Sequence, residues 1–184
     1  LVQLVQADRV DRGGRRIIKK KIAKRPNLLL EREVPFDELA AAGVTLATHL
    51  GNGVAHAQHK FDNPIMAQLA EDRLAACFIA DGIHVAPYAL GVMLRAKGIA
   101  RSILVTDAVT AAAAPAGRYA FAGMTIERSA DGSVREPNAT HLAGSSLTLD
   151  QAVRNVVAWG LCGFDDAIAM AGANARAAIA DAAR

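Results

Sequence analysis

The chain is poor in aromatic residues and in cysteine, and both shortages narrow its class. Phe, Trp and Tyr make up 4% of the 184 residues while hydrophobic residues make up 52%, so small aliphatic side chains must fill most buried positions. The two cysteines, Cys77 and Cys162, lie in apolar surroundings without the spacing of a metal site or a disulfide framework. We therefore expect two reduced thiols and a cytoplasmic protein.

Long apolar runs and targeting signals are also missing. No stretch reaches the roughly 18 consecutive apolar residues of a membrane-spanning helix, and we find no secretory signal pattern. The net charge of +3 reflects a basic stretch near the start, which includes a basic helix expected over residues 17–24. Aromatic residues do not interleave with it and no helix-turn-helix or zinc-ligand pattern accompanies it. We interpret it as a solvated basic face and expect neither a membrane nor a nucleic acid as partner.

Three apolar runs of strand length each lead to an ionisable side chain. Residues 44–48 precede His49, residues 77–80 precede a loop that ends in His84, and residues 102–106 precede Asp107. Helix-like segments follow the first two runs. Parallel strands of an α/β barrel carry their chemistry at their carboxyl ends, with the helices outside. We therefore expect an α/β fold in which His49, His84 and Asp107 converge on one pocket at a common edge of a parallel sheet.

Helical spacing and turn signals divide the remaining chain. Asn63-Pro64 indicates a helix start, with Asn as the cap, and the buried face of that helix is expected to include Ile65, Met66 and Leu69. Alternation within residues 119–136 indicates a hairpin that turns at residues 130–132. Further helices are expected over residues 35–42, 87–98, 148–159, 164–170 and 174–180.

Four motifs in this order resemble the N-acetylglucosamine-6-phosphate deacetylases of the metal-dependent amidohydrolase superfamily: THLGNG, IADGIHV, LVTDA and HLAGSSLTLDQAVRN. The resemblance covers residues 36 to 180. It implies a partial or complete (β/α)8 TIM-type barrel. At 184 residues the chain is short for a complete barrel of about 250, so we divide it into an anomalous basic segment, residues 1–35, and the C-terminal βα units of such a barrel, residues 36–184.

The resemblance also implies an activity and its central groups. The reaction is hydrolysis of the N-acetyl amide of a phosphorylated amino sugar, a step of amino-sugar metabolism, and it needs a divalent metal, with zinc or iron expected. His49 matches a metal ligand of the family, and imidazole suits either metal. Asp107 matches the general base that takes a proton from water and passes it to the departing amine. From the residues alone, His49 as a packed side chain and Asp107 as a helix cap remain open.

Five further residues match substrate-binding positions of the family. Asn52 and Gly53 match positions that hold the substrate phosphate, Lys60 falls where the family usually has a phosphate-binding arginine, His84 matches a substrate contact, and Leu142 matches the acetyl pocket. A lysine neutralises a phosphate as a point charge, without the bidentate fork of arginine. This departure leaves the exact substrate open.

Part of the family pattern is missing. Residues 1–35 contain neither the Thr-Leu-Ala-Pro-Glu-like motif nor the Gly-His motif that would supply a metal-binding glutamate and histidine. Two alternatives therefore stand beside the deacetylase: another metal-dependent amidohydrolase, such as a cyclic-amide hydrolase, and a non-catalytic fragment or pseudoenzyme. The resemblance also implies a homodimer.

Overall fold

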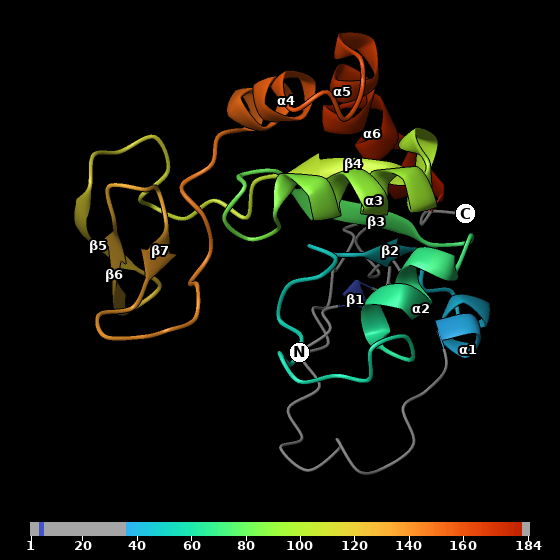
Figure 1. Ribbon diagram of the computed structural model, residues 1–184, viewed down its shortest axis with the longest axis horizontal. Coiled ribbons are helices and arrows are strands. Elements are labelled where there is room, and N and C mark those ends of the chain that lie inside the picture. The colour runs from blue at the N-terminus through green and yellow to red at the C-terminus, as the bar shows by residue number, and fades with distance from the viewer. Residues whose placement is uncertain (1–3, 6–35, 182–184) are drawn as a thin grey trace, which may run out of the picture.

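The computed structural model describes residues 4–5 and 36–181 (Figure 1). A four-stranded sheet runs through its larger part in the order β1-β2-β3-β4. Its strands are β1 (Leu4–Val5), β2 (Leu46–Ala47), β3 (Ala75–Ile79) and β4 (Ser102–Val105). β1 is antiparallel to β2, whereas β2, β3 and β4 are parallel. The basic helix expected at residues 17–24 and the rest of the basic segment lie outside the described residues, apart from β1.

Helices connect and cover the parallel strands. α1 (Phe36–Ala41) precedes β2, α2 (Pro64–Ala70) joins β2 to β3, and α3 (Pro87–Lys97) with the short 3-10 turn η2 (Ile99–Arg101) joins β3 to β4. After the second sheet come α4 (Leu149–Ala158), α5 (Phe164–Ala171) and α6 (Ala173–Asp181), which lie against β4. This confirms the expected α/β class. Over the described residues the sheet is open and makes part of an α/β architecture.

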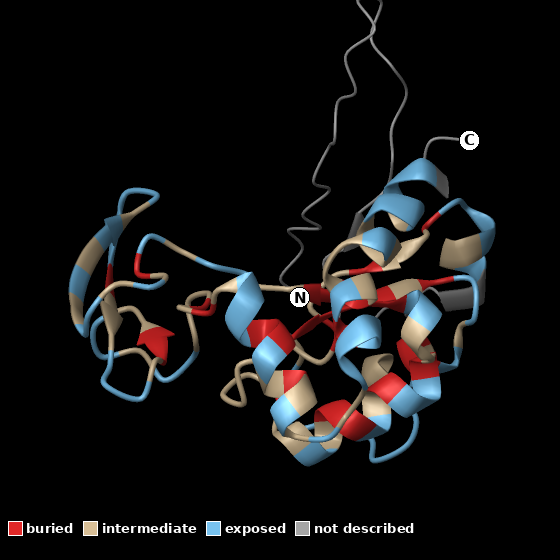
Figure 2. Ribbon diagram, turned by 90° about the horizontal axis from the view of Figure 1, so that it is seen from above, coloured by how far each residue is buried: buried red, intermediate tan, exposed pale blue. Residues whose placement is uncertain are grey.

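The central strand is buried on both faces. Phe78, Ile79 and Ala80 are at most 1% exposed, and the strands in the middle of Figure 2 are almost entirely buried. Continuous burial is typical of a parallel strand covered on both sides, in contrast to the alternation of a half-exposed strand. Leu90 and Leu94 of α3 and Val156 of α4 complete the same core.

A separate antiparallel sheet follows β4 and stands to one side of the larger part (Figure 1). It consists of β5 (Gly117–Phe121), β6 (Met124–Arg128) and β7 (Val134–Arg135). The expected turn at residues 130–132 is confirmed, since it joins β6 to β7. A second tight turn was not expected: Ala122 and Gly123 have φ of +49° and +82°, the left-handed pair that a two-residue hairpin requires.

Local details of the first crossover differ from expectation. Asn63 caps α2 as predicted, since its Oδ1 accepts from the Met66 backbone N–H at 3.0 Å. Met66 itself is 47% exposed, so its expected burial was wrong, and Gln68 is buried in the same short helix. Gln68 tolerates burial because its amide donates to the Pro64 carbonyl.

Cys77 and Cys162 are free, as predicted, and burial raises the pKa of the Cys77 thiol to about 12. None of the helices in the described part of the chain has the length and apolar character needed to cross a bilayer.

Lys97 links α3 to the C-terminal end of α2 by hydrogen bonds. Its side chain, at the end of α3, is fully buried, and its ammonium donates to the carbonyls of Gln68 at 2.8 Å and Glu71 at 2.7 Å at the end of α2. A cation at a helix C-terminus satisfies carbonyls that have no partner within the helix. Burial, helped by the nearby Arg101 charge, lowers the pKa of Lys97 from 10.5 to about 8.

Lys97→Met should destabilise the protein in a pH-dependent way. Two hydrogen bonds from a charged donor are lost, so we expect a cost of about 2–4 kcal/mol near pH 7. Between about pH 8 and 10.5 the unfolded state binds more protons at Lys97 than the folded state. Stability contributed by this group therefore rises with pH in that window. Urea unfolding at pH 7.5 and pH 10 should show a larger gap between wild type and variant at pH 10. Lys60→Met, at an exposed lysine, is the control; equal gaps at both pH values would contradict the prediction.

Candidate catalytic edge

His49 lies just beyond β2, in a turn held by backbone contacts. Its φ is +33°, which ends the strand at Ala47, earlier than the expected run of residues 44–48. The Leu50 N–H donates to the Cys77 carbonyl at 2.8 Å, and Asn52 donates to the His49 carbonyl from its backbone at 2.9 Å and from its side chain at 3.1 Å. The turn therefore holds the His49 backbone against the neighbouring strand.

The His49 ring carries an unpaired buried nitrogen. Its Nδ1 is inaccessible to solvent and has no hydrogen-bond partner in the described part of the chain. A buried polar atom without a partner costs about 1–3 kcal/mol, so such an atom in a native protein is explained by a bound water or ion, a catalytic role or strain. A free imidazole nitrogen at a strand end has the chemistry of a metal ligand.

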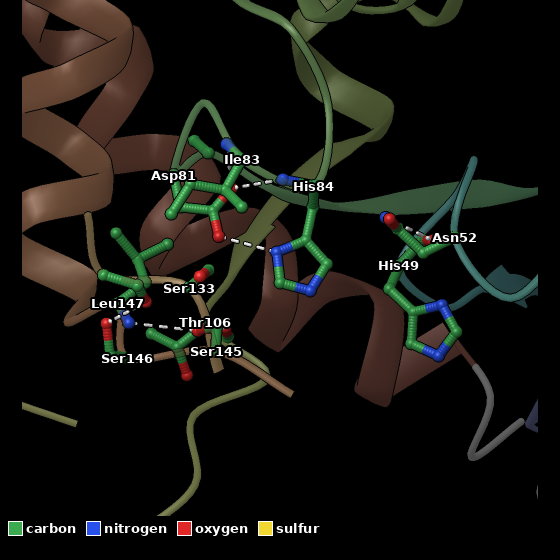
Figure 3. Close-up of polar contacts among 12 residues, drawn as sticks. His49, Asn52, Asp81, Ile83, His84, Thr106, Ser133, Ser145, Ser146 and Leu147 are labelled. Atoms are coloured by element: carbon green, nitrogen blue, oxygen red, sulfur yellow. Dashed lines mark hydrogen bonds and ion pairs between the residues drawn. The ribbon is translucent and has the colours of Figure 1, made fainter. Parts of the chain in front are cut away.

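Asp81 and His84 form a close pair in the loop after β3 (Figure 3). Asp81 Oδ1 accepts from the backbone N–H groups of Ile83 and His84, both at 2.9 Å, and Oδ2 lies 2.6 Å from His84 Nδ1. The two side chains are only 9% and 7% exposed. Burial alone would raise the pKa of Asp81, but the hydrogen bonds from the His84 ring and from the loop backbone outweigh it and lower that pKa. Asp81 is therefore a carboxylate at neutral pH.

Asp107 lies just beyond β4 in a left-handed conformation, with φ of +50°. Its carbonyl accepts from the Ser145 N–H at 2.9 Å, while Ser145 Oγ donates to the Thr106 carbonyl at 2.5 Å. The Asp107 residue is exposed, so burial does not force a partner on its carboxylate. The alternative of a helix cap does not hold, because a turn follows Asp107.

A pocket of about 390 Å³ opens beside Asp107. The loop before α4 supplies Leu142, and the second sheet supplies Phe121 and Met124. Leu142, matched in sequence to an acetyl pocket, thus shares a cavity with the carboxylate matched to the general base. The remaining lining residues are Ala108, Val109, Glu136, His141, Ala143 and Gly144.

The residues matched to phosphate binding lie in the loop after β2. Asn52 is half-buried, Gly53 is exposed with φ of +68°, and Lys60 is exposed with its ammonium 5.7 Å from the centre of the Phe61 ring. The side-chain amide of Asn52 uses one donor on the His49 carbonyl. This loop is accessible to a ligand, and its role in phosphate binding stays a prediction.

The three central residues share one edge of the sheet. Ala47 pairs with Ala76, and Ile79 pairs with Val105, so the loops with His49, His84 and Asp107 all leave the carboxyl ends of neighbouring parallel strands. Figure 3 draws the two imidazoles at this edge. Neither His49 nor His84 lines the pocket beside Asp107. The described residues contain no cluster of three metal-ligating side chains. Convergence on a single pocket therefore remains a prediction.

Asp81 is the residue of this edge to which sequence reasoning assigned no role. The available signal was its spacing to His84: an Asp followed by Gly accepts hydrogen bonds from the backbone two and three residues on, which closes a tight loop. That spacing predicts the loop, whereas the contact with the His84 ring needs the side-chain geometry.

Comparisons with known proteins agree on one group of enzymes, although no family model matches the chain. The N-acetylglucosamine-6-phosphate deacetylase of Lysinibacillus sphaericus is 33% identical over 140 residues, which cover 76% of this chain and 36% of that protein. The N-acetylgalactosamine-6-phosphate deacetylase of Escherichia coli O157:H7 is 36% identical over 116 residues, covering 63% of this chain and 30% of that protein. The chain thus spans about a third of the length of these curated relatives.

Solved structures point the same way. A mutant N-acetyl-D-glucosamine-6-phosphate deacetylase of Mycobacterium smegmatis, in complex with N-acetyl-D-glucosamine-6-phosphate, superposes with a TM-score of 0.71 at 29% identity, over 80% of this chain and 40% of that one. The N-acetylglucosamine-6-phosphate deacetylase of Thermotoga maritima gives a TM-score of 0.71 at 26% identity, over 79% of this chain and 39% of that one.

Gly144→Ala should disturb the Asp107 loop. Gly144 has φ of +79°, and an added Cβ would lie 2.5 Å from Val109 Cγ1 and 3.0 Å from the Asp107 carbonyl oxygen. Gly98 has the same φ with nothing within 4 Å, so Gly98→Ala carries only the cost of the left-handed backbone, about 1–3 kcal/mol. We expect Gly144→Ala to cost about 1–3 kcal/mol more, because of the steric clash. Urea unfolding of both variants measures the difference, and equal losses would show that the loop yields freely.

Proposed function

We propose that this chain, a relative of the N-acetylglucosamine-6-phosphate deacetylases over about a third of their length, forms part of the (β/α)8 barrel of such an enzyme. The reaction is hydrolysis of the N-acetyl group of N-acetylglucosamine-6-phosphate to glucosamine-6-phosphate and acetate. The observation that carries the proposal is the agreement of sequence relatives and solved structures on the same reaction. A homodimer, which the resemblance also implies, stays a prediction.

Asp107 is the proton-transfer group of this proposal. Its carboxylate is exposed at the carboxyl edge of β4, beside a pocket of about 390 Å³ that also contains Leu142. A base must be accessible to water and to the departing amine, and the exposed position permits both contacts. Asp107 accepts a proton from the attacking water and returns it to the amine nitrogen, while Leu142 packs against the acetyl methyl group.

His49 is the proposed metal ligand. The fit rests on its buried Nδ1, which lacks a hydrogen-bond partner within the described residues. When bound, a divalent metal such as zinc or iron supplies Lewis acidity toward water and toward the amide carbonyl. His49 provides one ligand of such a site. Residues 1–35, where the family motifs for further ligands would fall, lack those motifs and lie outside the described residues apart from Leu4 and Val5.

Four residues are proposed to hold the sugar phosphate, three at the phosphate and one at the sugar. Asn52, Gly53 and Lys60 lie in one accessible loop after β2, where a backbone N–H, an amide and an ammonium are donors for phosphate oxygens. His84 approaches the sugar from the next loop along the edge. The single positive charge of Lys60 attracts a phosphate without fixing its orientation.

N-acetylgalactosamine-6-phosphate is a second candidate substrate, because one relative is a deacetylase of that sugar phosphate. The Escherichia coli O157:H7 protein, 36% identical over 116 residues, is an N-acetylgalactosamine-6-phosphate deacetylase. The two sugars differ only in the configuration of one hydroxyl group, so the same amide chemistry serves both. The difference in kcat/KM between the two phosphorylated sugars measures which is preferred.

His49→Ala should remove the bound metal. The purified chain, loaded with zinc or iron and dialysed, is expected to retain metal, whereas His49→Ala loses most of it because a ligand is gone. His56→Ala, in the exposed loop, is the matched control and should retain metal as the wild type does. Full metal content in His49→Ala would exclude His49 as a ligand; a wild-type chain that binds no metal and releases no acetate would favour a non-catalytic fragment.

Asp107→Asn should abolish proton transfer while the metal stays bound. We expect acetate release from N-acetylglucosamine-6-phosphate to fall about 100-fold or more, with metal content unchanged. Asp72→Asn is the control, since Asp72 is an exposed carboxylate paired with Arg101 at 2.8 Å, before β3 begins. An Asp107→Asn enzyme with wild-type kcat would refute the assignment. Hydrolysis of a cyclic amide in place of the acetyl amide would favour the other amidohydrolase.

A further inference from the structure

We infer that Asp81 is a positioning residue that holds His84 in one ring orientation, with the proton on Nδ1, and so leaves Nε2 as the ring atom that meets the substrate. The inference rests on the proposed function for the identity of the substrate. It goes beyond that function by assigning a role to Asp81 and a defined hydrogen-bonding state to His84.

One carboxylate fixes both the loop and the ring. Asp81 Oδ1 accepts from the backbone N–H groups of Ile83 and His84, which closes the turn, and Oδ2 lies 2.6 Å from His84 Nδ1. Because both oxygens are engaged, the carboxylate cannot rotate without losing a contact. Figure 3 shows Asp81 bonded to the His84 backbone and to its ring at the same time.

The helix that packs beside the loop supports this geometry. Asn155 of α4 donates to the Ala80 carbonyl at 2.7 Å, directly before Asp81. The Trp159 ring lies where a Cβ on Gly82 would come within 3.3 Å of it, and Gly82 has φ of +75°. The pair is therefore built on a turn that α4 braces from outside, and its two side chains are almost fully buried.

The chemistry of the contact decides which nitrogen carries the proton. An ionised carboxylate only accepts hydrogen bonds, so the nitrogen facing it must be the donor. Asp81 is ionised at neutral pH, since its pKa lies below the ordinary value despite burial. His84 Nδ1 is thus protonated whether the ring is neutral or charged. The same hydrogen bond also fixes the orientation of the imidazole ring.

Nε2 is the atom left for a ligand. It has no hydrogen-bond partner among the described residues, and Figure 3 shows it on the side of the ring away from Asp81. In the neutral ring this nitrogen accepts a hydrogen bond, which suits a sugar hydroxyl or an amide N–H as partner. His84 therefore recognises a hydrogen-bond donor of the amino sugar.

Asp81→Asn separates the turn from the ring. The amide oxygen of Asn still accepts from the Ile83 and His84 backbone, while its NH₂ group faces His84 Nδ1 and donates to it. We expect the proton to move to Nε2, as a change of the His84 tautomer in ¹⁵N-histidine NMR spectra above pH 8. His84→Gln identifies the His84 signals by their loss. A wild-type His84 protonated on Nε2, or a tautomer unchanged in Asp81→Asn, would overturn the inference.

Asp131→Asn is the matched control. Asp131 closes a similar turn in the second sheet, where its Oδ1 accepts from the Ser133 N–H at 2.9 Å and from the Ser133 hydroxyl at 2.8 Å. No histidine among the described residues bonds to it. Its variant should leave the His84 spectrum unchanged. A His84 tautomer that changes equally in both variants would mean that general loosening, not the contact, causes the effect.

A double-mutant cycle tests the catalytic consequence. We expect Asp81→Asn to lower kcat/KM about 10- to 100-fold, and to lower it no further in a His84→Gln background, because Asp81 acts through His84. Additive losses would refute a positioning role. The NMR measurement needs no turnover, so an inactive chain would count against the proposed function while the tautomer result still decides the role of Asp81.

Discussion

The parallel pairing of β2, β3 and β4 is the constraint on which the candidate site depends. Ala47 lies beside Ala76, which in turn lies beside Ser102, and this register brings three loops to one edge of the sheet. Because side chains alternate between the faces of a strand, a slip of one residue would turn the buried Phe78 toward the opposite face. The tightly packed central strand makes that slip costly, so the core determines where the chemistry lies.

The edge itself is built from turns that side chains hold in place. Asp81 closes one turn, Ser145 links Thr106 and Asp107 to the loop before α4, and Asn52 closes the turn at His49. Functional side chains are commonly carried on loops that a rigid scaffold positions. Here His49 and Asp107 both adopt positive φ, which costs free energy for residues with a Cβ and persists only where the surroundings enforce it.

Much of the fold could be predicted from local signals. The Asn63-Pro64 cap, the turn at residues 130–132 and the alternation of strands with helices follow from backbone chemistry that acts over a few residues. The errors have tertiary causes. Met66 was expected to be buried, but it is largely exposed, and α2 turns Gln68 toward the core instead. The Pro64 carbonyl satisfies the Gln68 amide there, and Lys97 caps the helix end.

The sequence by itself determined that two imidazoles and a carboxylate, His49, His84 and Asp107, follow apolar runs of strand length, and its motifs indicated the family of relatives that the comparisons support. Only the tertiary structure decided how far these groups are buried and which side chains they contact. It left His49 Nδ1 buried with no hydrogen-bond partner in the described part of the chain, kept Asp107 exposed, and placed Asp81 against the His84 ring. The reason is that residue type and spacing specify the local turn, whereas burial and side-chain contacts depend on elements packed from distant parts of the chain.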